Sequence, residues 1–166
     1  TTAAPVTVTF TITPVSGTCT GAAITATVIV NPTPTVNAVA SETVCNNSAT
    51  TAVTFSGAVA GTVFNWTNTN TAIGLAASGT GNIASFTATN PGTAPISGTI
   101  TVTPSYTNAG TTCTGTSIIF TITVNPTPDV AQPANQVVCN NGATAAVNFT
   151  GAVAGTIFNW TNTDPT

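Results

Sequence analysis

The sequence contains no lysine, arginine, histidine or methionine, and its only acidic residues are Glu42, Asp129 and Asp164. Charged residues occupy 2% of the 166 positions, whereas they make up about a quarter of typical soluble domains. Nucleic-acid binding and docking on anionic lipid both depend on Lys and Arg, which neutralise phosphate groups. The sequence therefore predicts no nucleic-acid partner and no electrostatic attachment to a membrane.

The side chains on which most enzymes depend are also missing. General acid–base catalysis requires His or paired carboxylates, and the three acids are far apart in the sequence. Calcium sites take several carboxylates, and zinc sites take clusters of Cys and His, neither of which the chain contains. We therefore predict that the protein is not an enzyme and that it holds no cofactor and no metal.

Long apolar runs are absent too, because Thr and Gly interrupt the 42% of residues that are hydrophobic. A membrane-spanning helix needs roughly 18–20 consecutive apolar residues, so we predict no membrane insertion in these residues. The chain begins within a strand-like pattern, without the charged region and cleavage site of a signal peptide. We therefore expect it to be an internal part of a longer protein.

What the chain does contain is a long repeat. The 26 residues from Val44 to Thr69 return from Val138 to Thr163, with an offset of 94 residues and only five differences. The segment Asn-Pro-Thr-Pro that begins at Asn31 returns with the same offset. We therefore predict three parts: residues 1–30 as the second half of a preceding repeat, residues 31–124 as a complete repeat, and residues 125–166 as the first half of a following repeat.

Apolar residues alternate with Thr in many short segments, and this period of two predicts β-strands that are buried on one face. Helical periodicity appears nowhere in the chain. Gly-rich and Pro-Gly turns separate the segments, and a unit of roughly 100 residues with this pattern is typical of one β-sandwich. In the complete repeat we predict seven or so strands, near residues 35–39, 43–45, 52–56, 62–68, 75–77, 83–89, 96–103 and 117–124.

The same alternation predicts the core. Large apolar side chains share one face of the strands, while Thr, Ser and Asn occupy the other. The predicted core anchors are Phe55, Phe64, Trp66, Phe86, Phe120, Phe149, Phe158 and Trp160. For the two tryptophans the alternative is a platform on which a sugar stacks, and for the rows of Thr it is an ice-binding ladder rather than a solvated strand face.

Three stretches resemble a known family: VCNN at Val44, FNWTNTNTAIGLAASGTGNIASFTATNP over residues 64–91, and CTGTSIIFTITVNPTP over residues 113–128. They resemble the PKD-like, immunoglobulin-like repeats of very large surface proteins of Bacteroidetes-type bacteria, and the resemblance covers the whole chain. It implies an all-β fold of tandem immunoglobulin-like β-sandwich repeats of 94 residues. It also implies export to the extracellular cell surface by type IX secretion, as an adhesin or filament, in some cases for gliding motility.

The four cysteines, Cys19, Cys45, Cys113 and Cys139, give two per repeat and predict disulfides in an oxidising compartment. In an immunoglobulin-like topology Cys45 and Cys113 would lie at opposite ends of the sandwich, on the order of 25–35 Å apart. A disulfide needs Cα atoms within about 7 Å. We therefore expect the first cysteine of one repeat to meet the last cysteine of the following repeat; the alternative is a bond inside one repeat.

These observations favour a structural role, as a stiff extracellular rod or surface filament whose partners are neighbouring repeats or copies of itself. Very low charge supports this role, because little electrostatic repulsion opposes close association. Two alternatives stay open. One is a carbohydrate-binding adhesive module whose partner is a surface glycan, and the other is a pilus-like filament completed by strand exchange.

Overall fold

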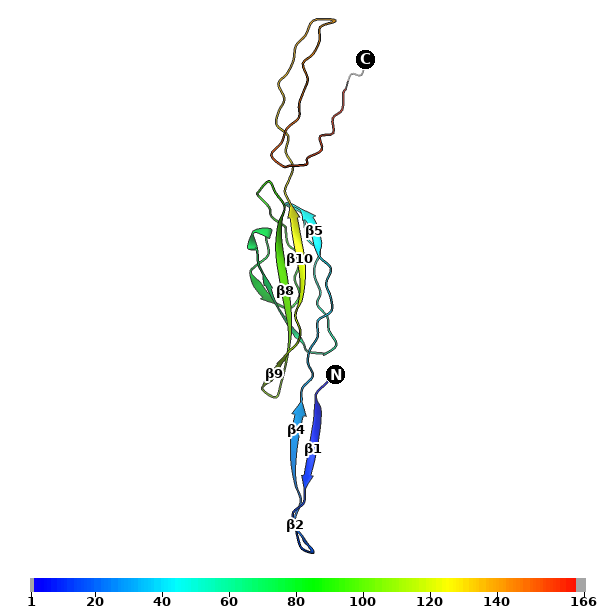
Figure 1. Ribbon diagram of the computed structural model, residues 1–166, viewed down its shortest axis with the longest axis vertical. Helices are drawn as coiled ribbons and strands as arrows, with labels where there is room; N and C mark the ends of the chain where they lie inside the picture. Colours follow the sequence, from blue (N-terminus) through cyan, green and yellow to red (C-terminus); the bar gives the residue numbers. More distant parts are fainter. Residues whose placement is uncertain (1, 164–166) are drawn as a thin grey trace.

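The computed structural model describes residues 2–163. The chain is nearly all-β, as predicted, and it is drawn out along one axis (Figure 1). An N-terminal hairpin is followed by a central sheet structure and then by a segment without regular strands. Asp164, one of the three acidic residues, lies outside the described residues.

The N-terminal hairpin pairs β1 (Val6–Ile12) with β4 (Ile24–Val30) in antiparallel orientation. The short strands β2 (Val15–Ser16) and β3 (Cys19–Thr20) close its tip. Alternating Val, Ile and Thr favour this extended conformation because their branched side chains fit a pleated surface. All residues of β1 and β4 are nevertheless exposed, since no second layer among the described residues covers them.

The central part is built on one sheet, with the strand order β5–β10–β8–β6–β7 and with β9 paired to the far end of β8. β5 runs parallel to β10, and the other neighbours are antiparallel. The 13-residue β8 is the longest strand and lies at the centre of the sheet. The strands are β5 (Glu42–Cys45), β6 (Val63–Asn68), β7 (Ser78–Thr80), β8 (Ile96–Asn108), β9 (Thr111–Thr114) and β10 (Ile118–Asn125).

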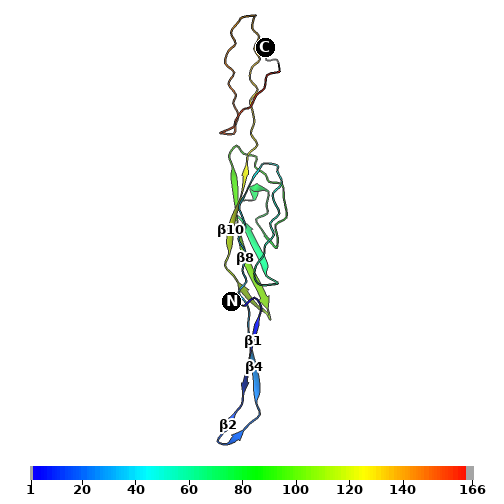
Figure 2. The same cartoon turned by 90° about the vertical axis from the view of Figure 1, so that its right-hand side faces the viewer.

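A second layer covers one face of this sheet. It consists of residues 47–55 and residues 83–89, which run antiparallel and are joined by main-chain hydrogen bonds. Val53 and Ile83, for example, exchange two such bonds, of 2.8 and 3.0 Å. Figure 2 shows these segments to one side of β8 and β10. The central part is therefore a two-layered β structure.

Three of the predicted strands, at residues 35–39, 52–56 and 83–89, are extended but do not form regular ladders. Side chains take the place of main-chain partners there: the Phe55 amide donates to the side-chain oxygen of Asn82 at 2.9 Å. Because such a bond uses a donor that a ladder would need, the pairing is interrupted after isolated bridges.

The strand predicted at residues 75–77 is wrong. The 3₁₀ turn η1 (Thr71–Ile73) precedes this stretch, and the next strand begins only at Ser78. The Asn70 side chain caps the turn by accepting from the Ala72 amide, and Gly74 ends it in the left-handed conformation, with φ of 95°. An Asn cap and a Gly stop are strong local signals for such a turn.

The core lies between the two layers. Ile100, Val102 and Val124 are fully enclosed, and they alternate along β8 and β10 with half-buried Thr side chains on the outer face. The core also contains Phe55, Trp66, Ile73, Leu75, Ile83, Ala88, Phe120 and Ile122. At about 1.5–3 kcal/mol for each large buried side chain, this cluster is the main source of stability in the molecule.

Residues 126–163 keep the turns of residues 32–69, although they contain no regular strand. The hydrogen bond from the Ala131 amide to the Thr150 carbonyl, at 2.7 Å, matches the one from Asn37 to Ser56, at 2.8 Å. Ring centroids are 6.0 Å apart for Phe149 and Phe158, and 5.7 Å for Phe55 and Phe64. Local sequence thus specifies the path of the segment even where its sheet partners are absent.

Of the predicted core anchors in this last segment, Phe158 is half-buried, whereas Phe149 and Trp160 are exposed among the described residues. Trp160 is 72% exposed and Phe149 is 36% exposed, whereas Trp66 is 7% exposed. The difference follows from the neighbours: Trp66 is flanked in the sheet by Val102 of β8 and Gly79 of β7, and no described strand occupies the equivalent places beside Trp160.

Candidate functional site

No cluster of reactive side chains is present in the part of the chain that the structure describes. Residues 2–163 contain no group of three or more His, Cys, Asp or Glu side chains that could hold a metal ion. The one carboxylate of the central part, Glu42, accepts hydrogen bonds from the amide and the hydroxyl of Thr51, both at 2.9 Å. Its role there is to tie β5 to the second layer.

Within residues 2–163 we find no helix with the length and apolarity needed to cross a lipid bilayer.

Trp66 is enclosed in the central part and does not offer a face to a ligand. Its ring packs against Gly79, where an added Cβ atom would come within 2.2 Å of the ring. Its Nε1 is buried without a hydrogen-bond partner in the described residues. In the central part, therefore, the tryptophan fills the core, and a sugar could not stack on it.

Phe64 and Phe86 are half-buried and pack against the same core, so the predicted anchors of the central part all lie in or against one cluster. The predicted anchors of the last segment, Phe149, Phe158 and Trp160, do not join it. They line an open hollow of about 660 Å³ together with Pro128, Asp129 and Val130.

The four cysteines are free, with Cys113 half-buried and the other three exposed. Cys45 ends β5 opposite Asn125, while Cys113 lies in β9 opposite Tyr106, near the far end of β8. Figure 1 shows β5 and β9 at opposite ends of the central sheet. Because residues 113 and 125 are joined by extended chain, the separation of Cys45 from Cys113 is on the order of 35 Å, far beyond the reach of a disulfide.

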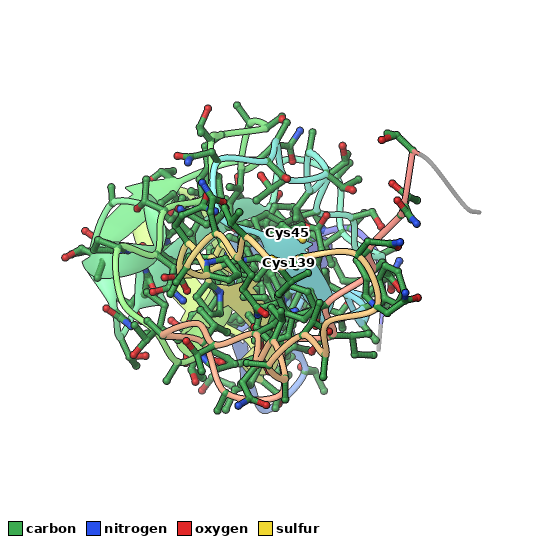
Figure 3. All side chains as sticks on the ribbon, turned by 90° about the horizontal axis from the view of Figure 1, so that it is seen from above. Cys45 and Cys139 are labelled. Carbon is green, nitrogen blue, oxygen red and sulfur yellow. The ribbon has the colours of Figure 1, made fainter. Side chains whose placement is uncertain are left out.

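Figure 3 looks along the long axis and shows Cys45 and Cys139 close together in projection. The two cysteines occupy equivalent places in the repeated sequence, 94 residues apart.

The joint between the hairpin and the central part is a pair of reciprocal amide hydrogen bonds. The Asn31 side chain donates to the Asn108 carbonyl at 3.1 Å, and the Asn108 side chain donates to the Asn31 side-chain oxygen at 2.8 Å. Beside this joint lies a hollow of about 580 Å³, and Cys113 and Val30 are among the residues that line it. The repeated Asn-Pro-Thr-Pro segment marks this joint in the sequence. Nothing in the sequence marks Asn108 as the hydrogen-bond partner of Asn31.

Two apolar faces are left uncovered, one at each end of the molecule. On the hairpin, Val8, Phe10 and Ile12 of β1 lie on one face and are 40%, 51% and 51% exposed. On the last segment, the uncovered face is the hollow that contains Phe149 and Trp160. Apolar faces of this kind mark interaction sites, and they are the candidate functional surfaces of the chain.

In comparisons with known proteins, no family model, no curated protein and no solved structure matches the chain.

Proposed function

We propose that the chain is a segment of an extracellular stalk or surface filament, with a mechanical and not a catalytic role. The observation that carries this proposal is the arrangement of the three parts along one axis (Figures 1 and 2). A short Asn-Pro-Thr-Pro link and the Asn31–Asn108 pair hold the first joint. Two prolines fix backbone angles in the link, so the joint is stiff.

The finer fold within this proposal is an immunoglobulin-like sandwich. A short parallel strand beside the last strand, a sheet order in which β10, β8 and β6 are neighbours, and a buried Trp on β6 all favour that topology. The 94-residue period and the motifs at Val44, Phe64 and Cys113 favour membership of the PKD-like surface repeats of Bacteroidetes-type bacteria. That family supplies the expectations of type IX secretion, of a role in adhesion, and of gliding motility.

A surface glycan is the alternative partner. The exposed Trp160, near Asp129 in a hollow of about 660 Å³, has the composition of a sugar-binding site. The equivalent Trp66 is buried in the complete repeat, so we place the stalk first. A glycan array probed with a protein of two complete repeats separates the two functions, because a saturable hit would favour adhesion through sugar.

The test of the extracellular role uses intact cells that produce the protein. Antibodies against the central part should label the cell surface, and external protease should remove the labelled material without lysis. Label that appears only after the cells are opened would contradict the proposal.

A further inference from the structure

The hairpins β2–β3 and β8–β9 have the same base but different lengths. At the base of β2–β3 the Gly21 amide donates to the Pro14 carbonyl at 2.9 Å, and at the base of β8–β9 the Gly115 amide donates to the Pro104 carbonyl at the same distance. Beyond this base β2–β3 has two cross-strand pairs, whereas β8–β9 has four. The β8–β9 hairpin therefore carries two additional pairs at its tip.

These additional pairs contain the residues that contact the link to the N-terminal hairpin. They are Thr107 with Thr112 and Asn108 with Thr111. The Asn31 side chain donates to the carbonyl of Asn108 at 3.1 Å and to that of Thr111 at 3.5 Å, and the Asn108 side chain donates back at 2.8 Å. A hairpin of the shorter kind would be about 7 Å shorter, at about 3.3 Å per residue, and would lack both partners of Asn31.

Hydrogen bonds, and not apolar packing, hold this contact together. A hollow of about 580 Å³ lies beside the tip, and Ile29, Val30 and Ala109 are among the residues that line it. Ile29 and Val30 stay 48% and 54% exposed, while Asn31 and Asn108 are half-buried. The pair of Asn side chains therefore carries the contact between the tip and the link.

The link leaves a short stretch at which the joint can turn. β4 ends at Val30, and Pro34 is fully buried and packs against Gly115 at the base of β8–β9. Residues 31–33 lie between these two fixed points. A proline fixes its own φ but not its ψ, so the link prolines by themselves do not set the direction of the hairpin. The contact of Asn31 acts at the place where this direction is decided.

The backbone of the tip is strained. Both central residues of the tip turn, Ala109 and Gly110, have positive φ, of 49° and 77°, as in a type I′ turn. Such turns favour Asn, Asp or Gly at the first central position, and Ala in the left-handed region is conformationally costly. The shorter hairpin has Gly17 at this position, with φ of 60°. Strain of this kind persists where surrounding contacts hold the residue, which indicates that the tip is held by its contact with the link.

We propose that residues 107–112 are a clasp, which reaches across the joint, holds Asn31 and fixes the direction of the β1–β4 hairpin relative to the central part (Figure 1). The length of the β8–β9 hairpin thus sets the stiffness of the joint. A repeat with a hairpin as short as β2–β3 has no clasp, and the joint that it faces bends. This inference deepens the proposed stalk function, on which it rests, because it names the element that makes a joint stiff.

The test measures the direction of the N-terminal hairpin in the full chain with two spin labels. One label is attached to Cys19 at the hairpin tip, and the other to an Ile119→Cys substitution on β10, where the side chain is 66% exposed. In every protein the remaining cysteines, Cys45, Cys113 and Cys139, are replaced by Ser. Electron paramagnetic resonance then gives the distribution of distances between the labels. We expect a single narrow distribution for the chain with an unaltered clasp.

Two changes should release the clasp. Asn31→Ala removes the hydrogen bonds from the side of the link, and a graft of the sequence of residues 15–20 in place of residues 105–114 removes the tip. Asn31 lies outside the core, so its loss leaves the central sheet intact. Each change should roughly double the width of the distribution, because the joint loses the contact that limits its opening.

The two changes combined separate a clasp from a general loss of stability. Asn31→Ala in the grafted chain should widen the distribution no further, because residues that act through one contact are not additive and the graft already lacks the partners of Asn31. Asn70→Ala is the matched control. It removes an exposed hydrogen bond to the Ser97 carbonyl, in a part of the sheet away from the joint, and should leave the width unchanged.

Three results would overturn the clasp. If Asn31→Ala and the graft both keep a narrow distribution, the clasp is wrong, while the stalk function stands with a joint that the link alone makes stiff. If the two changes widen the distribution additively, they do not act through one contact. A broad distribution for the chain with an unaltered clasp would contradict both the clasp and a stiff joint, and labelling of the cell surface would still test the extracellular role.

Discussion

Close contacts at single residues decide how tightly the segments of the central part pack. Gly79 is one such residue, because it pairs with Trp66 on the neighbouring strand of the same sheet and the Trp66 ring lies against its backbone. Asn90 is another: it is 2% exposed, and its side chain donates to the carbonyl groups of Ala94 and of Val124 in β10. Neither could be recognised from the sequence, since Gly and Asn are frequent throughout the chain.

Gly79→Ala should destabilise the central part by about 1–3 kcal/mol, because the new methyl group overlaps the Trp66 ring and one of them must move. Urea unfolding followed by tryptophan fluorescence measures the change. Ser78→Ala, at the neighbouring exposed position of β7, is the matched control and should change stability by less than about 0.5 kcal/mol. Equal stability of the two variants would contradict the packing described here.

Asn90→Ala should cost about 1–3 kcal/mol, because the carbonyls of Ala94 and Val124 lose their donor at 2.9 and 2.8 Å in a buried place. Asn37→Ala removes an exposed side-chain hydrogen bond and should cost less. The comparison of the two unfolding free energies checks whether burial, and not the amide group itself, sets the effect.

At the scale of elements, the same local sequence adopts two different structures. FNWTN occurs at residues 64–68 and at residues 158–162, yet it forms β6 with a buried Trp66 in one place and an exposed, unpaired segment in the other. Alternation predicted β8 and β10, and their buried faces, because both strands are long and flanked by partners. It could not predict which strands lack a partner, since pairing depends on residues far away in the chain.

The strand predictions for the edge and second-layer segments were incomplete for a related reason. Residues 83–89 alternate as well as β10 does, but side-chain acceptors such as Asn82 and Thr50 interrupt their ladder. The large separation of Cys45 from Cys113 could be predicted from the order of the strands alone, and the structure places the two residues at opposite ends of the sheet. The uncovered hollow beside Trp160 could be recognised only in the three-dimensional structure.

Hydrogen exchange should separate the hairpin from the central sheet. A lone two-stranded hairpin is marginal in water, so amides of β1 and β4 in dilute, reduced protein should exchange far faster than those of β8 and β10. Exchange measured by mass spectrometry checks this difference. Protection of the hairpin amides equal to that of β8 and β10 would contradict the exposure of the hairpin faces.

At the scale of the whole molecule, the lack of cations sets the response to conditions. The chain has no Lys, Arg or His, so it has no side-chain ion pairs for salt to screen and no imidazole to titrate near neutral pH. The unfolding free energy of the reduced chain should therefore be constant between about pH 5.5 and about pH 7.5, and the chain should show no loss of stability on addition of sodium chloride. Calorimetry at several pH values and salt concentrations checks both.

We expect successive repeats to form one straight, stiff rod. β8 has 13 residues and spans roughly 43 Å at about 3.3 Å per residue, so each repeat should add about 40–50 Å along the axis. Electron microscopy of proteins with two, four and six complete repeats measures this directly. We predict rods whose end-to-end length rises in proportion to repeat number; lengths that rise as the square root of repeat number, as for freely jointed beads, would contradict the account.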